Sequence, residues 1–219
     1  MKQTFEIEIP TKWEDVTLLS YLNLQKDLEN YKDNEDVQLD LMIHHLCGVH
    51  LDAIRGMSLE SYTKFKDGFY KLEKPESLPL QRFVTIGGVE YGFEPNLSKM
   101  AYGAYLDVSQ YDGLTIDKNW AKIMNILYRP VTSKKGELYQ IEPYQGKDDW
   151  EKWLTVRMDV HFGALFFFIV LWKDLLHATL NSLKEMEIPP SIKKTLVKSG
   201  KVIAQSLTSP EGILGKWMK

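Results

Sequence analysis

The side chains best suited to chemistry in this sequence gather in one short stretch. His44, Cys47 and His50 lie three residues apart, and His45 stands beside them. Zinc prefers imidazole and thiolate ligands, but a closed structural site needs four of them, usually as two separated pairs. Here the three lie at the end of one helix-forming segment, and the sequence has no second pair. The pattern therefore favours a helix terminus with partly buried polar tips, and we expect no metal and no cofactor.

Other catalytic patterns are missing from the sequence. Cys47 lies among apolar residues at helical spacing, which favours a place in the core, and no G-x-S-x-G elbow occurs. Gly87 and Gly88 lack the following Lys and Ser or Thr that complete a phosphate-binding loop. The carboxylate pairs Glu14–Asp15 and Asp148–Asp149 fall where helices should begin, so capping and the helix dipole account for them. We therefore expect no catalytic residue and a protein that is not an enzyme.

The composition is that of an ordinary globular chain. Of its 219 residues, 44% are hydrophobic and 26% are charged, which excludes a disordered protein. The net charge of -3 argues against a nucleic-acid binder held by bulk electrostatics. The single cysteine excludes an internal disulfide framework and is typical of a reducing compartment. The first ten residues are charged and alternating, so they lack the apolar region of a signal peptide.

The longest apolar run, residues 163–172, reads GALFFFIVLW. A membrane-spanning helix needs about 20 apolar residues, and a longer run here would place Lys173 and Asp174 inside hydrocarbon. The run therefore predicts a helix buried on nearly all sides within the protein, with the cluster 166–168 in the core. An oligomer interface is the alternative use, and no membrane is expected as a partner.

Hydrophobic periodicity predicts a helical first part that follows one short strand. Strict alternation over residues 2–9 predicts a half-buried strand. Apolar residues at helical spacing then predict a helix over residues 13–31. Asp36 is expected to cap a second helix, which Gly48 ends. Two further short helices are expected, over residues 51–56 and 58–71.

The clearest local signal is residues 82–94, which read RFVTIGGVEYGFE. The two central glycines tolerate the positive φ angles that a tight hairpin loop requires. A two-residue loop places Ile86 opposite Val89 and Val84 opposite Tyr91. A hairpin of this size needs a partner surface, so we expect it to pack on the surrounding helices.

Helices and a second small hairpin are expected in the rest of the chain. Apolar spacing predicts a helix over residues 116–127, which Pro130 must end. The second hairpin would turn through Lys135 and Gly136. Further helices are expected within residues 97–111 and 148–183. The predicted fold class is therefore mainly α with a minor β component, in three segments: 1–74 (strand and helices), 75–188 (hairpin and helical core) and 189–219 (basic, amphipathic).

The C-terminal segment differs in charge from the rest of the chain. Residues 191–219 carry six lysines and one glutamate, a balance of +5, which leaves -8 on residues 1–190. A basic amphipathic segment near an aromatic terminus suits docking on an acidic partner surface. Folding back on the acidic body of its own chain is an equally open alternative. The residues predicted to bind a partner are Lys194, Lys198, Lys201, Trp217 and Met218.

Two sets of residues in the first seventy carry a resemblance. They are Ile9-Pro10, Trp13, Val16-Thr17-Leu18 and Tyr21, and then Leu46-Cys47-Gly48-Val49, Leu51, Ile54 and Met57-Ser58. Together they resemble the opening of tail assembly chaperones of tailed bacteriophages, in which an N-terminal strand leads into a helix. The sequence departs from that pattern at His50, where a serine cap is usual, and it lacks a glutamate three residues later.

A later set of residues resembles a second, related group. Ile126-Leu127-Tyr128-Arg129-Pro130, Tyr139 and Pro143-Tyr144 are similar to structural-region proteins of phages of Bacteroidetes, including crAss-like phages. The resemblance implies a tail assembly chaperone that holds tail or tape-measure subunits in the host cytoplasm. The alternative it leaves open is a permanent virion component, such as a connector, baseplate or tail hub subunit. Either role implies contact with other phage tail or virion proteins, no nucleic acid and no cofactor, and self-association is left open.

Overall fold

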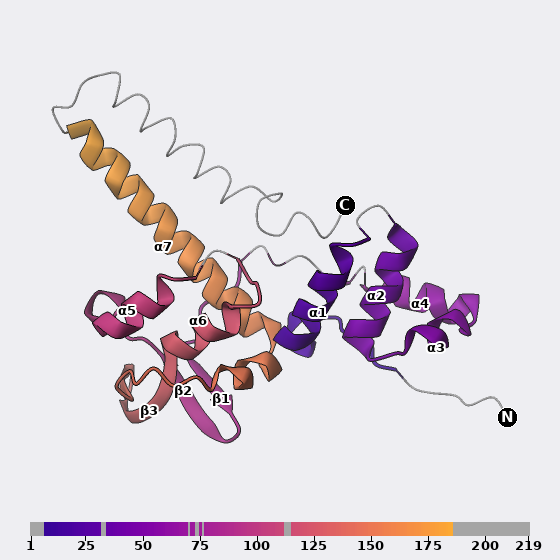
Figure 1. Cartoon of the computed structure of the whole chain (residues 1–219), viewed down its shortest axis with the longest axis horizontal. Helices are drawn as coiled ribbons and strands as arrows, with labels where there is room; N and C mark the ends of the chain where they lie inside the picture. The colour runs from indigo at the N-terminus through magenta and orange to yellow at the C-terminus, as the bar shows by residue number, and fades with distance from the viewer. Residues whose placement is uncertain are drawn as a thin grey trace.

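The computed structural model describes residues 7–31, 34–69, 71–72, 75, 77–111 and 115–185. Most described residues are helical, and one small antiparallel sheet holds four strands in the order in which they follow along the chain. The predicted fold class, mainly α with a minor β component, is confirmed. Figure 1 shows the first helices on one side of the molecule, the sheet on the other, and a long last helix rising from between them.

The first part of the chain forms short helices with local capping groups. Thr17 caps the first α-helix by accepting a hydrogen bond from the backbone N–H of Ser20. Asn34, not Asp36, caps the second, because it precedes the first turn while Asp36 lies within that turn. Gly48 ends it with a φ of 69°, as predicted. The elements are 3-10 helix η1 (Trp13–Asp15), α1 (Leu18–Leu28), α2 (Glu35–Cys47), α3 (Leu51–Arg55) and α4 (Leu59–Phe69).

The predicted N-terminal strand is wrong where it can be checked. Residues 2–6 lie outside the described part of the chain, and Ile7 to Pro10 belong to no strand. Ile9 instead packs against α4, where an added Cβ at Gly68 would come within 2.7 Å of its side chain. Ile7 and Ile9 thereby join a small apolar cluster around Ile43 and Phe65. Packing against helices half-buries Ile7 and Ile9, the residues that the sequence pattern assigned to a strand.

The hairpin of residues 82–94 forms with the predicted register. Strands β1 (Phe83–Ile86) and β2 (Val89–Phe93) pair Ile86 with Val89 and Val84 with Tyr91. Gly87 and Gly88 have φ angles of 57° and 81°, which the two-residue turn requires. The buried rings at the end of β2 pack into the main core, so the hairpin covers the helices as expected.

A second hairpin extends the first into one sheet. Strands β3 (Tyr128–Lys135) and β4 (Leu138–Ile141) form the expected second hairpin. The pairing of β2 with β3, which places Phe93 opposite Tyr128, was not predicted. Gly92 permits close packing here, because an added Cβ would lie 2.9 Å from the side chains of Tyr139 and Ile141. Strands β1 and β4 are therefore the two edges of the sheet.

The main core lies between the sheet, α1 and the helices of the second part. Helix α6 ends at Leu127, ahead of Pro130 as predicted, and Trp120 on α6 is fully buried. Trp153 and Phe162 are also almost fully buried, and Trp13 packs edge-on against Phe162. The remaining elements are η2 (Leu97–Lys99), α5 (Tyr102–Val108), α6 (Trp120–Leu127), η3 (Trp150–Thr155) and α7 (Met158–Glu185).

The apolar run 163–172 is buried only at its beginning, so the prediction of all-round burial is wrong. Residues 163–165 are buried and residues 166–169 are half-buried, with the Phe167 ring centroid 5.3 Å from that of Phe93. Val170 and Leu171 are exposed. In Figure 1 the second half of α7 extends beyond the sheet and α6, so these elements cover only its first turns. Within the described residues, no helix is both long and apolar enough to cross a membrane.

Candidate functional site

The residues predicted to bind a partner, Lys194, Lys198, Lys201, Trp217 and Met218, lie outside the described part of the chain. Their role therefore stays a prediction. The same holds for the choice between a C-terminal segment that docks on a partner and one that folds back.

The histidines at the end of α2 each contact a neighbouring protein atom. His44 Nδ1 lies 2.8 Å from the carbonyl oxygen of Val49, and His45 Nε2 lies 2.8 Å from a carboxylate oxygen of Asp27. No group of three His, Cys, Asp or Glu side chains within the described residues is placed to hold a metal ion. These contacts hold the two rings in place at the end of α2.

Cys47 is half-buried and packs against the small apolar cluster around Ile43 and Phe65, so its predicted place in the core is confirmed only in part. It is the last residue of α2. Burial raises the pKa of the Cys47 thiol to about 11. The thiol therefore stays protonated at neutral pH, which is the unreactive form.

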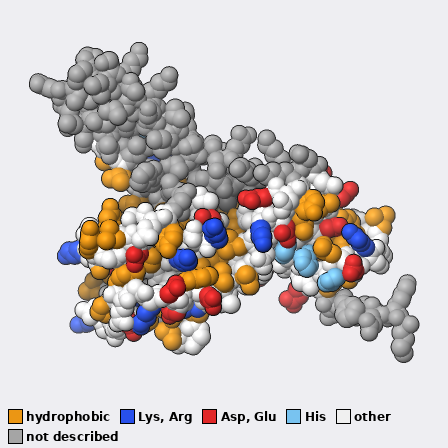
Figure 2. All heavy atoms as spheres, viewed as in Figure 1, with side chains coloured by type: hydrophobic (Ala, Val, Ile, Leu, Met, Phe, Trp, Pro, Cys, Tyr) orange, Lys and Arg blue, Asp and Glu red, His pale blue; other side chains and the backbone are white. Residues whose placement is uncertain are grey.

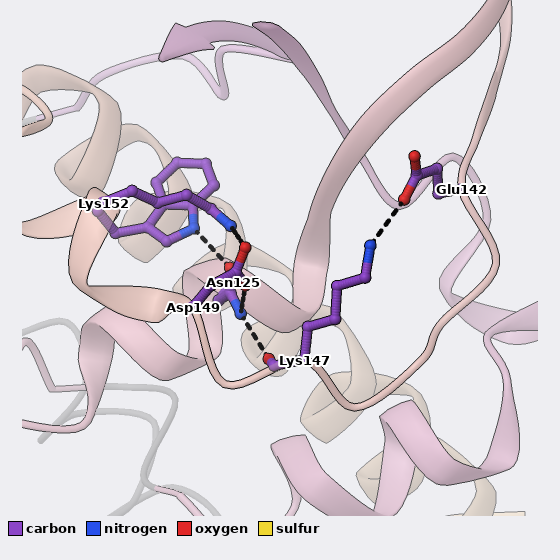
Figure 3. Close-up of polar contacts among 6 residues, drawn as sticks. Asn125, Glu142, Lys147, Asp149 and Lys152 are labelled. Atoms are coloured by element: carbon purple, nitrogen blue, oxygen red, sulfur yellow. Dashed lines mark hydrogen bonds and ion pairs between the residues drawn. The ribbon is translucent and has the colours of Figure 1, made fainter. Parts of the chain in front are cut away.

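A small cleft lies beside the sheet, between α6, the start of β3, the loop 142–149 and η3. Its volume is about 140 Å³, enough for one small side chain or a few waters. Asn125 of α6 holds the loop in place (Figure 3): its Nδ2 donates to the Lys147 carbonyl oxygen and to Asp149 Oδ1, at 3.0 and 3.1 Å. Its Oδ1 accepts from Trp153 Nε1 at 3.2 Å. One amide side chain thus joins three segments.

Each charged side chain that lines the cleft has an opposite partner. Lys152 Nζ lies 2.7 Å from Asp149 Oδ2, and Lys147 Nζ lies 3.4 Å from Glu142 Oε2. Arg129 pairs with the buried carboxylate of Glu94. The hydrogen bond from Lys152, followed by that from Asn125, holds the pKa of Asp149 below its ordinary value. Asp149 is thus kept ionised and paired, which does not suit a general acid.

Replacing Asn125 with alanine is expected to lower the free energy of unfolding by about 1–3 kcal/mol. The change removes three hydrogen bonds and leaves the indole N–H of the buried Trp153 without its acceptor. Urea unfolding followed by tryptophan fluorescence measures the loss. Asn30→Ala is the matched control, because Asn30 makes one long, exposed bond to the Lys26 carbonyl oxygen. An equal loss in both variants would contradict a structural role for Asn125.

Helix α5 presents the most exposed aromatic side chains among the described residues of the second part. Tyr102, Tyr105 and Leu106 are 74%, 59% and 42% exposed, and we call these three residues the α5 patch. Their spacing of three and four places them on one face of the helix. Figure 2 shows hydrophobic side chains gathered in the region where α5 lies. Tyrosine is one of the residues enriched at protein-binding surfaces.

The opposite face of α5 is anchored to the body. Ala104 is fully buried, and the hydroxyl of Tyr144 donates a hydrogen bond to the Asp107 carboxylate. Burial, followed by the bond to Asp107, raises the pKa of Tyr144 to about 12, so the hydroxyl remains a donor. The α5 patch is therefore presented by a fixed helix.

Sequence reasoning found neither Asn125 nor the α5 patch. Asn125 stands inside an apolar helix pattern, and its partners are more than twenty residues away along the chain. The pattern of residues 97–111 predicted helix without indicating which face is covered. Comparisons of the chain with protein-family models, curated proteins and solved structures found no match.

Proposed function

We propose that this protein acts by binding other polypeptides during assembly of a bacteriophage tail, as a non-enzymatic tail assembly chaperone. The α5 patch is the observation that supports a binding role. The phage setting is supported by the resemblance of the first seventy residues to tail assembly chaperones. Its clients would be tail or tape-measure subunits, and its place of action the host cytoplasm.

The physical argument concerns the two tyrosines of the α5 patch. Tyr102 and Tyr105 keep most of their surface in water, whereas the rings of Trp120 and Trp153 are fully buried. A tyrosine offers a large apolar area and a polar tip for a small loss of side-chain entropy, which is why tyrosine is enriched at protein interfaces. Because α5 is anchored through Ala104 and Asp107, binding would order little else.

A permanent virion component is the alternative function. Mass spectrometry of purified particles separates the two, because a chaperone is released before the particle is complete and a structural subunit remains. We expect the protein in lysates of infected cells and not in the particles. Stoichiometric recovery of the protein from purified particles would contradict the chaperone proposal and favour a virion subunit.

Replacing both Tyr102 and Tyr105 with serine is expected to weaken the complex with the phage tape-measure protein at least tenfold. Exposed aromatic anchors at interfaces each contribute roughly 1–2 kcal/mol, and tenfold in affinity corresponds to about 1.4 kcal/mol. Co-expression followed by titration of the purified partners measures the change. Tyr31→Ser is the matched control, since Tyr31 is an exposed tyrosine outside the α5 patch, just beyond the C-terminal end of α1. Unchanged binding by the double variant would exclude the α5 patch as the contact.

A further inference from the structure

Strand β1 is an open edge of the sheet with unpaired backbone groups. A backbone hydrogen bond of 2.9 Å joins Phe93 N–H to the Arg82 carbonyl oxygen, and the register pairs Val84 with Tyr91. Hydrogen bonding alternates along an antiparallel pair, so Phe83 and Thr85 direct their N–H and C=O groups away from β2. Among the described residues, no hydrogen bond uses these four groups.

A groove runs along this edge. Its volume is about 490 Å³, within the range of ligand-binding clefts. β1 forms one wall, and the segment 155–157 with Val160 at the start of α7 forms the other. In Figure 1, β1 is the strand nearest to this segment.

Both walls of the groove are held in place. Tyr128 Oη donates a hydrogen bond of 2.7 Å to the Gln81 carbonyl oxygen, two residues before β1. Gln81 Nε2 donates to Asp159 Oδ2 at 2.6 Å, which ties the same segment to the start of α7. The opposite wall is fixed by backbone hydrogen bonds from Leu18 N–H to the Val156 carbonyl and from Met158 N–H to the Val16 carbonyl. The groove is therefore preformed.

The exposed lining of the groove is mainly polar and carries one cation. Val84 and Ile86 are half-buried on the β1 side, Val156 and Val160 are buried in the core, and Arg157 is the one charged side chain among the described residues of the lining. The Arg157 side chain is half-exposed and uses Nη2 for its ion pair with Asp159, so the guanidinium has further N–H donors beyond this pair. A chain with a net charge of -3 thus presents a cation beside open strand hydrogen-bonding groups.

We propose that this groove binds an extended, acidic segment of another polypeptide, which adds to β1 as a fifth antiparallel or parallel strand. Backbone groups of Phe83 and Thr85 would supply affinity, the half-buried side chains of Val84 and Ile86 would contact alternate side chains of the bound strand, and Arg157 would pair with a carboxylate. The proposal does not depend on the α5 patch or on a role in tail assembly.

Amide hydrogen exchange of the full chain tests the proposal directly. The probe is an acetylated and amidated hexapeptide of alternating valine and glutamate. We expect it to slow exchange at Phe83 and Thr85, while Val84 and Ile86, already paired with β2, remain unchanged and serve as internal controls. The same peptide with N-methylated backbone amides should give no protection. Unchanged exchange at Phe83 and Thr85 at saturating peptide, or equal protection by the N-methylated peptide, would overturn the proposal.

A pair of variants tests the backbone contact separately. Thr85→Pro removes the outward N–H and no bond to β2, so it is expected to weaken peptide binding roughly tenfold, the equivalent of one lost hydrogen bond. Thr85→Val keeps the N–H and should bind like the original chain. Binding of the peptide by the proline variant at the original affinity would contradict strand addition. The proposal would also be contradicted if the original chain formed a concentration-dependent dimer that the proline variant abolished, because a second copy would then occupy the edge. If the proline variant fails to fold, Arg157→Gln should weaken binding and reduce its salt dependence.

Discussion

Replacing Gly163 with alanine is expected to lower the free energy of unfolding by about 3 kcal/mol. A Cβ at this position would lie 2.5 Å from the carbonyl oxygen of Pro79, a contact that a backbone atom cannot relieve by a rotamer change. The Pro79 segment is also held nearby by the hydrogen bonds of Gln81. Without this contact, alanine in a helix interior stabilises the fold over glycine by about 1 kcal/mol. A loss of stability in the Gly163 variant would therefore indicate the close contact with Pro79.

Urea unfolding of the Gly163 variant measures this loss, and Gly56→Ala is the matched control. An added Cβ at Gly56 would meet nothing closer than 3.7 Å, and the backbone there has a negative φ of -87°. The control is therefore expected to be neutral or slightly stabilising. A Gly163 variant as stable as the original chain would show that α7 does not pack this closely on the segment that leads into β1.

Acidification is expected to destabilise the fold through His161. This side chain is fully buried, and Trp120 Nε1 donates a hydrogen bond of 3.2 Å to its Nδ1. Burial lowers the pKa of His161 to about 3, from an ordinary value of 6.5. The unfolded chain therefore takes up its proton first as the pH falls. The stabilisation is complete above pH 6.5 and declines towards pH 3, by about 2 kcal/mol at pH 5 and about 4 kcal/mol at pH 3.

The contribution of His161 is isolated by comparing variants across pH. His161→Gln keeps an acceptor for Trp120 and cannot be protonated, so its stability should fall less between pH 7 and pH 4 than that of the original chain. His50→Gln is the control, because His50 is exposed and its loss should leave the acid sensitivity intact. Urea midpoints at each pH give the comparison. Parallel curves for the original chain and His161→Gln would exclude His161 as the acid-sensitive group.

The elements that could be predicted from the sequence are those specified by neighbouring residues. The register of the first hairpin follows from its two glycines, and the end of α6 follows from Pro130. Gly48 ends α2 because its φ of 69° favours glycine. Such signals act between residues that are close in sequence, so the structures they specify do not depend on tertiary packing.

The sequence by itself determined a mainly helical chain with a minor β component and two hairpins. Only the tertiary structure decided that β2 pairs with β3, that Ile9 packs on α4 without a strand, and that α7 is buried only in its first turns. It also decided that the α5 patch faces water and that β1 borders a groove. Burial of a face depends on which distant element lies against it, and no local pattern carries that information.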